Sequence, residues 1–288
     1  MLEFLALSDS KGVGKMLGRY HDNPYIVKML EKSPQSRLVA GACHTLLLAT
    51  SGQVYACGYN YFGQLGLGDT DDRTSFTLVP TPAPVLSIVA GATYTLLLTT
   101  SGQVYACGRN REGQLGLGDT YNRTSFTLVP TPAPVLSIVA GVHHTLLLTA
   151  SGQVYACGSN YYGQLGLGDK KTYTSFTLIS TPAPVLALVA GDNHTLLLTA
   201  SGQVYACGNN QQGQLGLGDM VNRTSFTLVP TLAPVLALVA GAHYTLLFAV
   251  EGQVYAYGYN HRGQLGLGDT KSRISFTLVP ISHHLNHP

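Results

Sequence analysis

Tryptophan is absent from the sequence, and charged residues are scarce. Charged side chains make up 10% of the 288 residues, well below the roughly 25% that is usual in soluble domains. The formal net charge is only +2, an excess too small to indicate nucleic-acid binding by itself. Apolar residues make up 45% of the chain, which excludes a disordered polar chain and predicts a globular protein with a substantial core.

The sequence also has no long hydrophobic run. No uninterrupted apolar segment reaches the roughly 20 residues that a membrane-spanning helix needs, and the apolar run in MLEFLALSDS is too short for a secretory signal. The five cysteines are an odd number, which favours reduced thiols over a disulfide framework. We therefore expect an intracellular protein, cytoplasmic or nuclear, with no membrane partner.

Glycine, by contrast, is abundant and strictly periodic. The motif GQVYA begins at Gly52, Gly102, Gly152, Gly202 and Gly252. The motif GQLGLGD follows in step and begins at Gly63, Gly113, Gly163, Gly213 and Gly263. A glycine-rich loop that binds phosphate is normally needed once, so five copies at a constant spacing of 50 residues indicate a structural role.

Each repeat contains four short strand-like segments. In the second repeat they are residues 85–91, 93–100, 103–108 and 125–130. The Ser-Gly pair before QVYACG predicts a tight hairpin turn, because glycine tolerates a positive φ. The prolines that follow SFTLVP end the pairing, since proline has no N–H to donate to a sheet.

The strand-like segments also indicate how the repeats pack. TLLLT is apolar at consecutive positions, so both faces of that strand must be covered. A four-stranded antiparallel sheet covered on both faces is typical of a propeller blade, whereas parallel solenoids usually have a shorter repeat. We therefore predict an all-β fold, a β-propeller of five four-stranded blades over residues 37–288. The blades are expected at about residues 37–83, 84–133, 134–183, 184–233 and 234–280.

The repeat VAGxxHTLLLTxSGQVYACGxNxxGQLGLGD resembles that of the regulator of chromosome condensation family, whose members are β-propellers. The resemblance extends from Arg37 to Pro280. It implies the two activities of the founding member, guanine-nucleotide exchange on a small GTPase and chromatin binding, with a small GTPase or a nucleosome as partner. Two features differ from the family pattern. The founding member has seven blades, whereas five repeats are counted here. The family usually has a tryptophan before the glycine that closes the third strand, and its place is taken here by Cys57, Cys107, Cys157, Cys207 and Tyr257.

The first 36 residues lack the repeat. Val13, Met16, Leu17 and Tyr20 follow helical spacing, and a second helical pattern begins after Pro24. We expect two short helices here, ahead of the propeller. The segment YIVKMLEK is also similar to the end of an F-box, a resemblance that implies a ubiquitin-ligase adaptor.

No group of residues predicts a catalytic, cofactor-binding or metal-binding site. His44, His144 and His194 share one position in the repeat, and rotation about a propeller axis keeps equivalent residues apart. We expect each of these rings to form a structural hydrogen bond within its own blade. Asp69, with two further aspartates close behind it, fits turn chemistry better than a calcium loop. We predict a protein that is not an enzyme.

The repeats differ most in the loop after the third strand. An asparagine there never changes, and we expect it to brace the turn and to adopt a left-handed conformation. Its neighbours vary, and varied loops on a fixed scaffold are how propellers build a binding surface. Tyrosine and arginine are the side chains that dominate protein interfaces. The predicted partner-binding residues are Tyr59, Tyr61, Phe62, Arg109, Arg111, Tyr161, Tyr162, Tyr259 and Arg262.

These observations favour a monomeric, non-enzymatic scaffold that binds a protein partner through one face of the propeller. Nucleotide exchange is the first alternative, but the uniform period leaves no space for an inserted wedge. Chromatin binding is another, although the basic residues of the first 36 are mixed with acidic ones. The F-box-like segment makes an adaptor of a ubiquitin ligase the third alternative.

Overall fold

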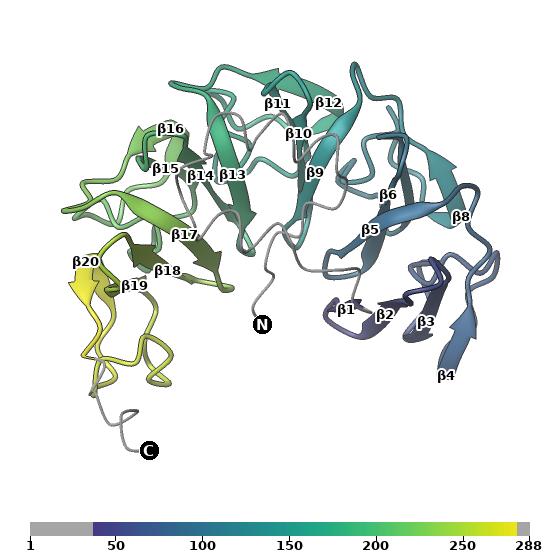
Figure 1. Ribbon diagram of the computed structural model, residues 1–288, viewed down its shortest axis with the longest axis horizontal. Helices are drawn as coiled ribbons and strands as arrows, with labels where there is room; N and C mark the ends of the chain where they lie inside the picture. The colour runs from purple at the N-terminus through teal and green to yellow at the C-terminus, as the bar shows by residue number, and fades with distance from the viewer. Residues whose placement is uncertain (1–36, 281–288) are drawn as a thin grey trace. The chain divides into compact units, whose positions relative to one another are not determined.

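The computed structural model describes residues 37–280 (Figure 1). In this range it contains twenty strands and no helix, arranged as five antiparallel four-stranded sheets. Each sheet takes its strands in sequence order, so that each repeat forms one sheet. The predicted all-β fold with five four-stranded blades is therefore confirmed. The two predicted helices and the F-box-like segment lie outside the described residues.

The chain divides into two compact units. Of the described residues, unit 1 contains 37–109 and 122–129, and unit 2 contains 110–121 and 130–280. The strands of unit 1 are β1 (Arg37–Ala40), β2 (His44–Leu48), β3 (Val54–Gly58), β4 (Arg73–Leu78), β5 (Val85–Ala90), β6 (Tyr94–Thr99), β7 (Val104–Gly108) and β8 (Arg123–Leu128). The strands of unit 2 are β9 (Val135–Ala140), β10 (His144–Thr149), β11 (Val154–Gly158), β12 (Tyr173–Ile179), β13 (Val185–Ala190), β14 (His194–Thr199), β15 (Val204–Gly208), β16 (Arg223–Leu228), β17 (Val235–Ala240), β18 (Tyr244–Ala249), β19 (Val254–Gly258) and β20 (Arg273–Leu278).

The second and third strands of each sheet are joined by the predicted hairpin turn. In the second repeat the N–H of Gly102 donates to the carbonyl of Thr99 at 3.0 Å, and Gly102 has a φ of 79°. A glycine adopts this left-handed conformation without steric cost. The Thr99 hydroxyl accepts the N–H of Gln103 at 3.0 Å and so closes the turn from the side. The Ser-Gly signal in the sequence thus marks the turn correctly.

The core of each unit lies between neighbouring sheets. In unit 1, Leu46 and Leu48 of β2 pack in one cluster with Ile88 and Leu97 of the following sheet. In unit 2 the same arrangement recurs between successive sheets. Strands β6, β10 and β14 are buried at every position, so both faces of the TLLL segment are covered in the three middle repeats. The equivalent strands of the first and last repeats, β2 and β18, keep partly exposed positions.

The GQLGLGD segment is a contact between repeats. Gly66 has a φ of 71°, and a Cβ added to it would lie 2.4 Å from the ring of Phe126 in the next repeat. The N–H of Gly68 donates to the carbonyl of Thr124 at 2.9 Å. Leu67 forms an isolated antiparallel bridge with Ser125 of β8. The glycines therefore let the loop of one repeat approach the last strand of the next, which confirms their structural role.

Among residues 37–280, no helix is long and apolar enough to cross a membrane.

Candidate partner-binding loops

The variable loop follows the third strand of each sheet and is held by its unchanging asparagine. The Oδ1 atom of Asn60 accepts the N–H of Leu65 at 2.9 Å, and its Nδ2 atom donates to the backbone carbonyl and the carboxylate of Asp69, both at 3.1 Å. Asn60 is fully buried. The same bonds recur in the other four repeats. The asparagine braces the turn as predicted.

The conformation predicted for that asparagine is wrong. Between residues 37 and 280, only glycines have a positive φ, so Asn60 and its equivalents are not left-handed. The left-handed positions fall on Gly58 before the asparagine and Gly63 after it, with φ values of 104° and 82°. Because these glycines supply the sharp bends, the asparagine is free to keep an ordinary backbone and to use its side chain as the brace.

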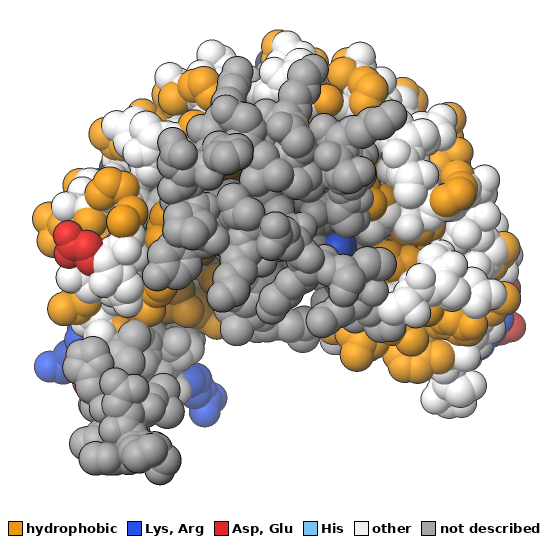
Figure 2. Space-filling model, viewed as in Figure 1, with side chains coloured by type: hydrophobic (Ala, Val, Ile, Leu, Met, Phe, Trp, Pro, Cys, Tyr) orange, Lys and Arg blue, Asp and Glu red, His pale blue; other side chains and the backbone are white. Residues whose placement is uncertain are grey.

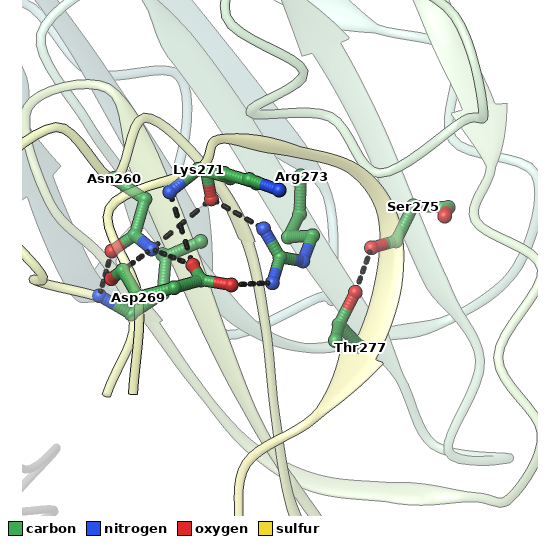
Figure 3. A network of polar contacts seen from close by, with 7 residues as sticks. Asn260, Asp269, Lys271, Arg273, Ser275 and Thr277 are labelled. Atoms are coloured by element: carbon green, nitrogen blue, oxygen red, sulfur yellow. Dashed lines mark hydrogen bonds and ion pairs between the residues drawn. The ribbon is translucent and has the colours of Figure 1, made fainter. Parts of the chain in front are cut away.

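An aspartate–arginine pair closes the far end of the loop. In the last repeat, Arg273 donates to a carboxylate oxygen of Asp269 at 2.7 Å, and the other carboxylate oxygen accepts the N–H of Lys271 at 3.0 Å (Figure 3). The same pair joins Asp69 to Arg73 at 2.6 Å. The N–H of Asp71 and the Arg73 guanidinium lower the pKa of the Asp69 carboxyl. This carboxylate is engaged in the turn, in agreement with turn chemistry at the aspartates of the first repeat.

The structure brings four of the predicted residues together in unit 1. The rings of Tyr59 and Tyr61 are stacked with centroids 6.3 Å apart, and Phe62 meets both edge-on, at 6.1 Å and 5.1 Å. Arg109 belongs to the next repeat, and its guanidinium carbon lies 5.5 Å from the centre of the Phe62 ring. Tyr61 keeps 65% of its surface exposed. We call these four residues the aromatic cluster.

The predicted residues of unit 2 make separate contacts of their own. The hydroxyl of Tyr161 donates to a carboxylate oxygen of Glu112 at 3.3 Å, across neighbouring repeats. Tyr259 packs against His261, with ring centroids 4.7 Å apart. Arg111 and Arg262 are exposed, and Tyr162 is half-buried.

Sequence reasoning missed Glu112 and His261. Both stand at the variable positions of the loop, at or next to the position of Phe62 in the repeat. The variation of these loop positions from repeat to repeat was the only feature of the sequence that pointed to the two residues. Neither residue is a tyrosine, a phenylalanine or an arginine, so a prediction based on those side chains passed over them.

A buried polar chain links successive repeats behind the loops. The Nε2 atom of His44 lies 3.0 Å from Oγ1 of Thr95, and that hydroxyl donates to the carbonyl of Gln64 at 2.7 Å. Because the hydroxyl proton goes to the carbonyl, Nε2 must donate, and the proton of the neutral ring lies there. Burial lowers the pKa of His44 to about 4. The predicted bond within the same blade is therefore wrong, because the ring reaches into the next repeat.

Face-to-face packing of four-stranded sheets, one for each 50-residue repeat, defines a β-propeller. A family model described as the RCC1-like domain matches residues 11–287. The chain therefore belongs to the RCC1-like domain family.

Curated relatives match only short segments. The X-linked retinitis pigmentosa GTPase regulator of Canis lupus familiaris is 45% identical over 56 residues, which are 19% of this chain and 6% of that protein. The probable E3 ubiquitin-protein ligase HERC4 of Rattus norvegicus is 41% identical over 51 residues, 18% of this chain and 5% of the ligase. The matched segments thus span a small fraction of these relatives.

Solved structures share the fold. Yeast RCC1 (Prp20) bound to Kap60 has a TM-score of 0.79 and 21% identity, over 87% of this chain and 62% of Prp20. Prp20p from Saccharomyces cerevisiae, described with its binding properties to Gsp1p and histones, has a TM-score of 0.78 and 22% identity, over 87% of this chain and 64% of that one. At this level of identity the likeness concerns the fold alone.

Proposed function

We propose that this protein is a non-enzymatic interaction scaffold that binds a protein partner through the variable loops. The observation that supports this most is the aromatic cluster. It combines an exposed tyrosine, two further rings and an arginine held over one of them. Tyrosine and arginine are the side chains that most often dominate protein interfaces. The loop beneath them is held by buried hydrogen bonds, so little ordering is needed on binding.

The other predicted loop residues belong to unit 2, and the proposal includes them as partner-binding residues of that unit. Arg111, Tyr161, Tyr162, Tyr259 and Arg262 stand at equivalent places in later repeats. The bond from Tyr161 to Glu112 holds that tyrosine in position for a partner. We place the protein inside the cell, in the cytoplasm or nucleus, because five cysteines without a pairing pattern suit a reducing compartment.

The test compares two loops of the same chain. Tyr61→Ala and Arg109→Ala remove parts of the aromatic cluster, whereas Gln211→Ala changes the residue equivalent to Tyr61 in the fourth repeat. Proteins captured from a cell lysate are quantified by mass spectrometry and the best candidate is purified. We expect Tyr61→Ala to weaken its binding at least about tenfold, and Gln211→Ala to leave it unchanged. Equal affinities for all three variants would contradict the proposal.

Nucleotide exchange on a small GTPase is the second candidate function. One matched relative is called a GTPase regulator, and Prp20p is described with its binding to Gsp1p. Release of a fluorescent guanine nucleotide from a small GTPase, measured with and without the protein, separates the two functions. A scaffold leaves the release rate unchanged, and an exchange factor accelerates it.

A further inference from the structure

Within residues 37–280, the first and last repeats each expose apolar side chains on one face of their sheet. In the first sheet, Leu38 of β1 is 67% exposed, whereas its equivalent in the second repeat, Ile88, is 5% exposed. Leu47 of β2 is half-buried, whereas Leu97 at the same place in β6 is fully buried. Phe76 of β4 is 46% exposed. We call these three residues, Leu38, Leu47 and Phe76, the leading face. Figure 2 shows hydrophobic side chains gathered at the surface in the region where Figure 1 labels β1 and β2.

The last repeat is open on the opposite side of its sheet. Leu246 is half-buried, although Leu96 at the same place in the second repeat is fully buried. Phe248 is 43% exposed, and Leu98, its equivalent, is 1% exposed. The loop Gly263–Asp269 borders this side and has the same sequence, GQLGLGD, as the other four. We call Leu246, Phe248 and this loop the trailing face.

These two faces are the two halves of the contact that already joins neighbouring repeats within each unit. At every such contact, the loop carbonyl of one repeat accepts a threonine hydroxyl of the next, as Gln64 accepts Thr95 at 2.7 Å. The N–H of the last glycine in GQLGLGD donates to a backbone carbonyl in the last strand of the following repeat, as Gly68 does to Thr124 at 2.9 Å. The loop leucine between them forms the bridge seen for Leu67 and Ser125.

The chain contains the groups for one more such contact. Gln264, Leu267 and Gly268 stand at these loop positions in the last of the five repeats. Thr45, Thr74 and Ser75 stand at the matching acceptor and donor positions of the first of the five repeats. The strand sequence TSFTL is identical in β4 and β8. The loop of the last repeat and the first repeat therefore carry the same hydrogen-bonding groups, at the same positions, that meet at each contact between repeats.

We propose that the protein self-associates head to tail, with the leading face of one copy packed on the trailing face of a second copy. A second copy is the favoured occupant because its trailing face presents the loop carbonyl, loop leucine and loop glycine that meet the following repeat at every contact between repeats. The exposed apolar side chains Leu38 and Phe248 mark an interaction site. The contact is heterologous, because it joins two different surfaces, so it can extend to further copies. The proposal departs from the monomer expected from the sequence and does not depend on the loop-binding function.

Light scattering on the purified full chain tests the association. We expect a mass above that of one chain, rising with protein concentration. Leu38→Glu and Phe248→Glu each disable one face and should both be monomeric. An equal mixture of the two should form a dimer that grows no further, because each variant retains one intact face. Leu232→Glu is the matched control, since Leu232 is 82% exposed and lies outside both faces, and it should keep the wild-type mass.

Cysteine cross-linking tests the contact directly and leaves the exposed apolar side chains of both faces, Leu38 and Phe248, in place. Ser75→Cys and Leu267→Cys place thiols at positions equivalent to the Leu67–Ser125 bridge, and residues paired across antiparallel strands are close enough for a disulfide. On oxidation, a mixture of the two single variants should give a covalent dimer, and neither alone should do so. A wild-type chain that stays monomeric at all concentrations would overturn the proposal. So would a double variant that forms only an internal disulfide.

Discussion

A side chain placed at one of the repeated glycines can destabilise the protein in two separable ways, by straining the backbone and by overlapping a neighbouring residue. Gly66 and Gly52 both have a positive φ, at 71° and 81°. A Cβ on Gly66 would overlap the Phe126 ring, whereas a Cβ on Gly52 would meet nothing within 4 Å. The two positions therefore share the conformational cost of a side chain and differ in the packing cost.

We expect Gly52→Ala to destabilise the protein by about 1–2 kcal/mol, the cost of a left-handed alanine. Gly66→Ala should cost about 1–3 kcal/mol more, because the side chain also forces the neighbouring repeat away. Urea unfolding followed by circular dichroism measures both. Equal losses would mean that Phe126 moves aside freely and that the close approach is not needed.

Buried histidines make stability depend on pH. Burial lowers the pKa of His44 to about 4 and that of His194 to about 3, and burial together with His143 lowers the pKa of His144 to about 3. Between pH 6.5 and 4 the unfolded chain therefore binds more protons than the folded one. Above about pH 6.5, the pKa of a histidine in the unfolded chain, these rings do not reduce the free energy of unfolding. As the pH falls below that value, the unfolded chain takes up protons and the free energy of unfolding decreases.

We expect the free energy of unfolding to decrease by roughly 1.4 kcal/mol per pH unit for each of the three rings over this window. Tyrosine occupies the equivalent position in the second and fifth repeats, as Tyr94 and Tyr244. The triple variant His44→Tyr, His144→Tyr, His194→Tyr should therefore fold and should show a much flatter pH profile. A profile as steep as that of the wild type would place the pH dependence on other groups.

At the scale of the element, the variable loop is held by its buried asparagine more than by its surface ion pair. Asn210 is fully buried, and its side chain bonds both Leu215 and Asp219. Arg223 forms a pair with Asp219 at 2.6 Å, but both side chains are partly exposed to water. Exposed ion pairs contribute little, whereas a buried polar group that loses its partner is costly.

We expect Asn210→Ala to cost about 1–3 kcal/mol of stability and Arg223→Ala less than about 1 kcal/mol. Thermal unfolding of the two variants gives the comparison. High salt should narrow the difference between Arg223→Ala and the wild type and leave the effect of Asn210→Ala in place. A larger loss for Arg223→Ala would contradict this account of the loop.

At the scale of the whole molecule, equivalent residues differ because of their place in the array of repeats. Leu47 and Leu97 occupy the same position of the second strand and have the same immediate neighbours in sequence. Leu97 is fully buried in the core of unit 1, and Leu47 is half-buried on the leading face. The cost of removing a leucine side chain depends on how much of it is buried.

Leu97→Ala should therefore cost about 2–5 kcal/mol, and Leu47→Ala clearly less in the dilute, dissociated protein. At high concentration the two costs should converge, because the proposed second copy covers Leu47. Chemical unfolding at two protein concentrations measures both effects. If the cost of Leu47→Ala stays constant with concentration, its surface is not part of a contact between copies.

The sequence by itself determined the strands, the hairpin turns and the repeat. A period of 50 residues, the TLLLT segment and the paired Ser-Gly turn are local patterns, and local patterns decide local backbone conformation. The structural role of the glycine cluster also followed from its five copies. The Asn60 brace was predicted, but its left-handed backbone was not found, because the adjacent glycines absorb the bend.

Only the tertiary structure decided which side chains meet across repeats. The bond from His44 to Thr95 and the place of Arg109 over Phe62 join residues about one repeat apart in sequence. Such contacts depend on how one sheet is rotated and shifted against the next, and the sequence of a single repeat contains no measure of that rotation. Burial is decided in the same way. Leu38 and Ile88 stand at equivalent positions of the repeat, and only the stacking of the sheets leaves one at 67% exposure and the other at 5%.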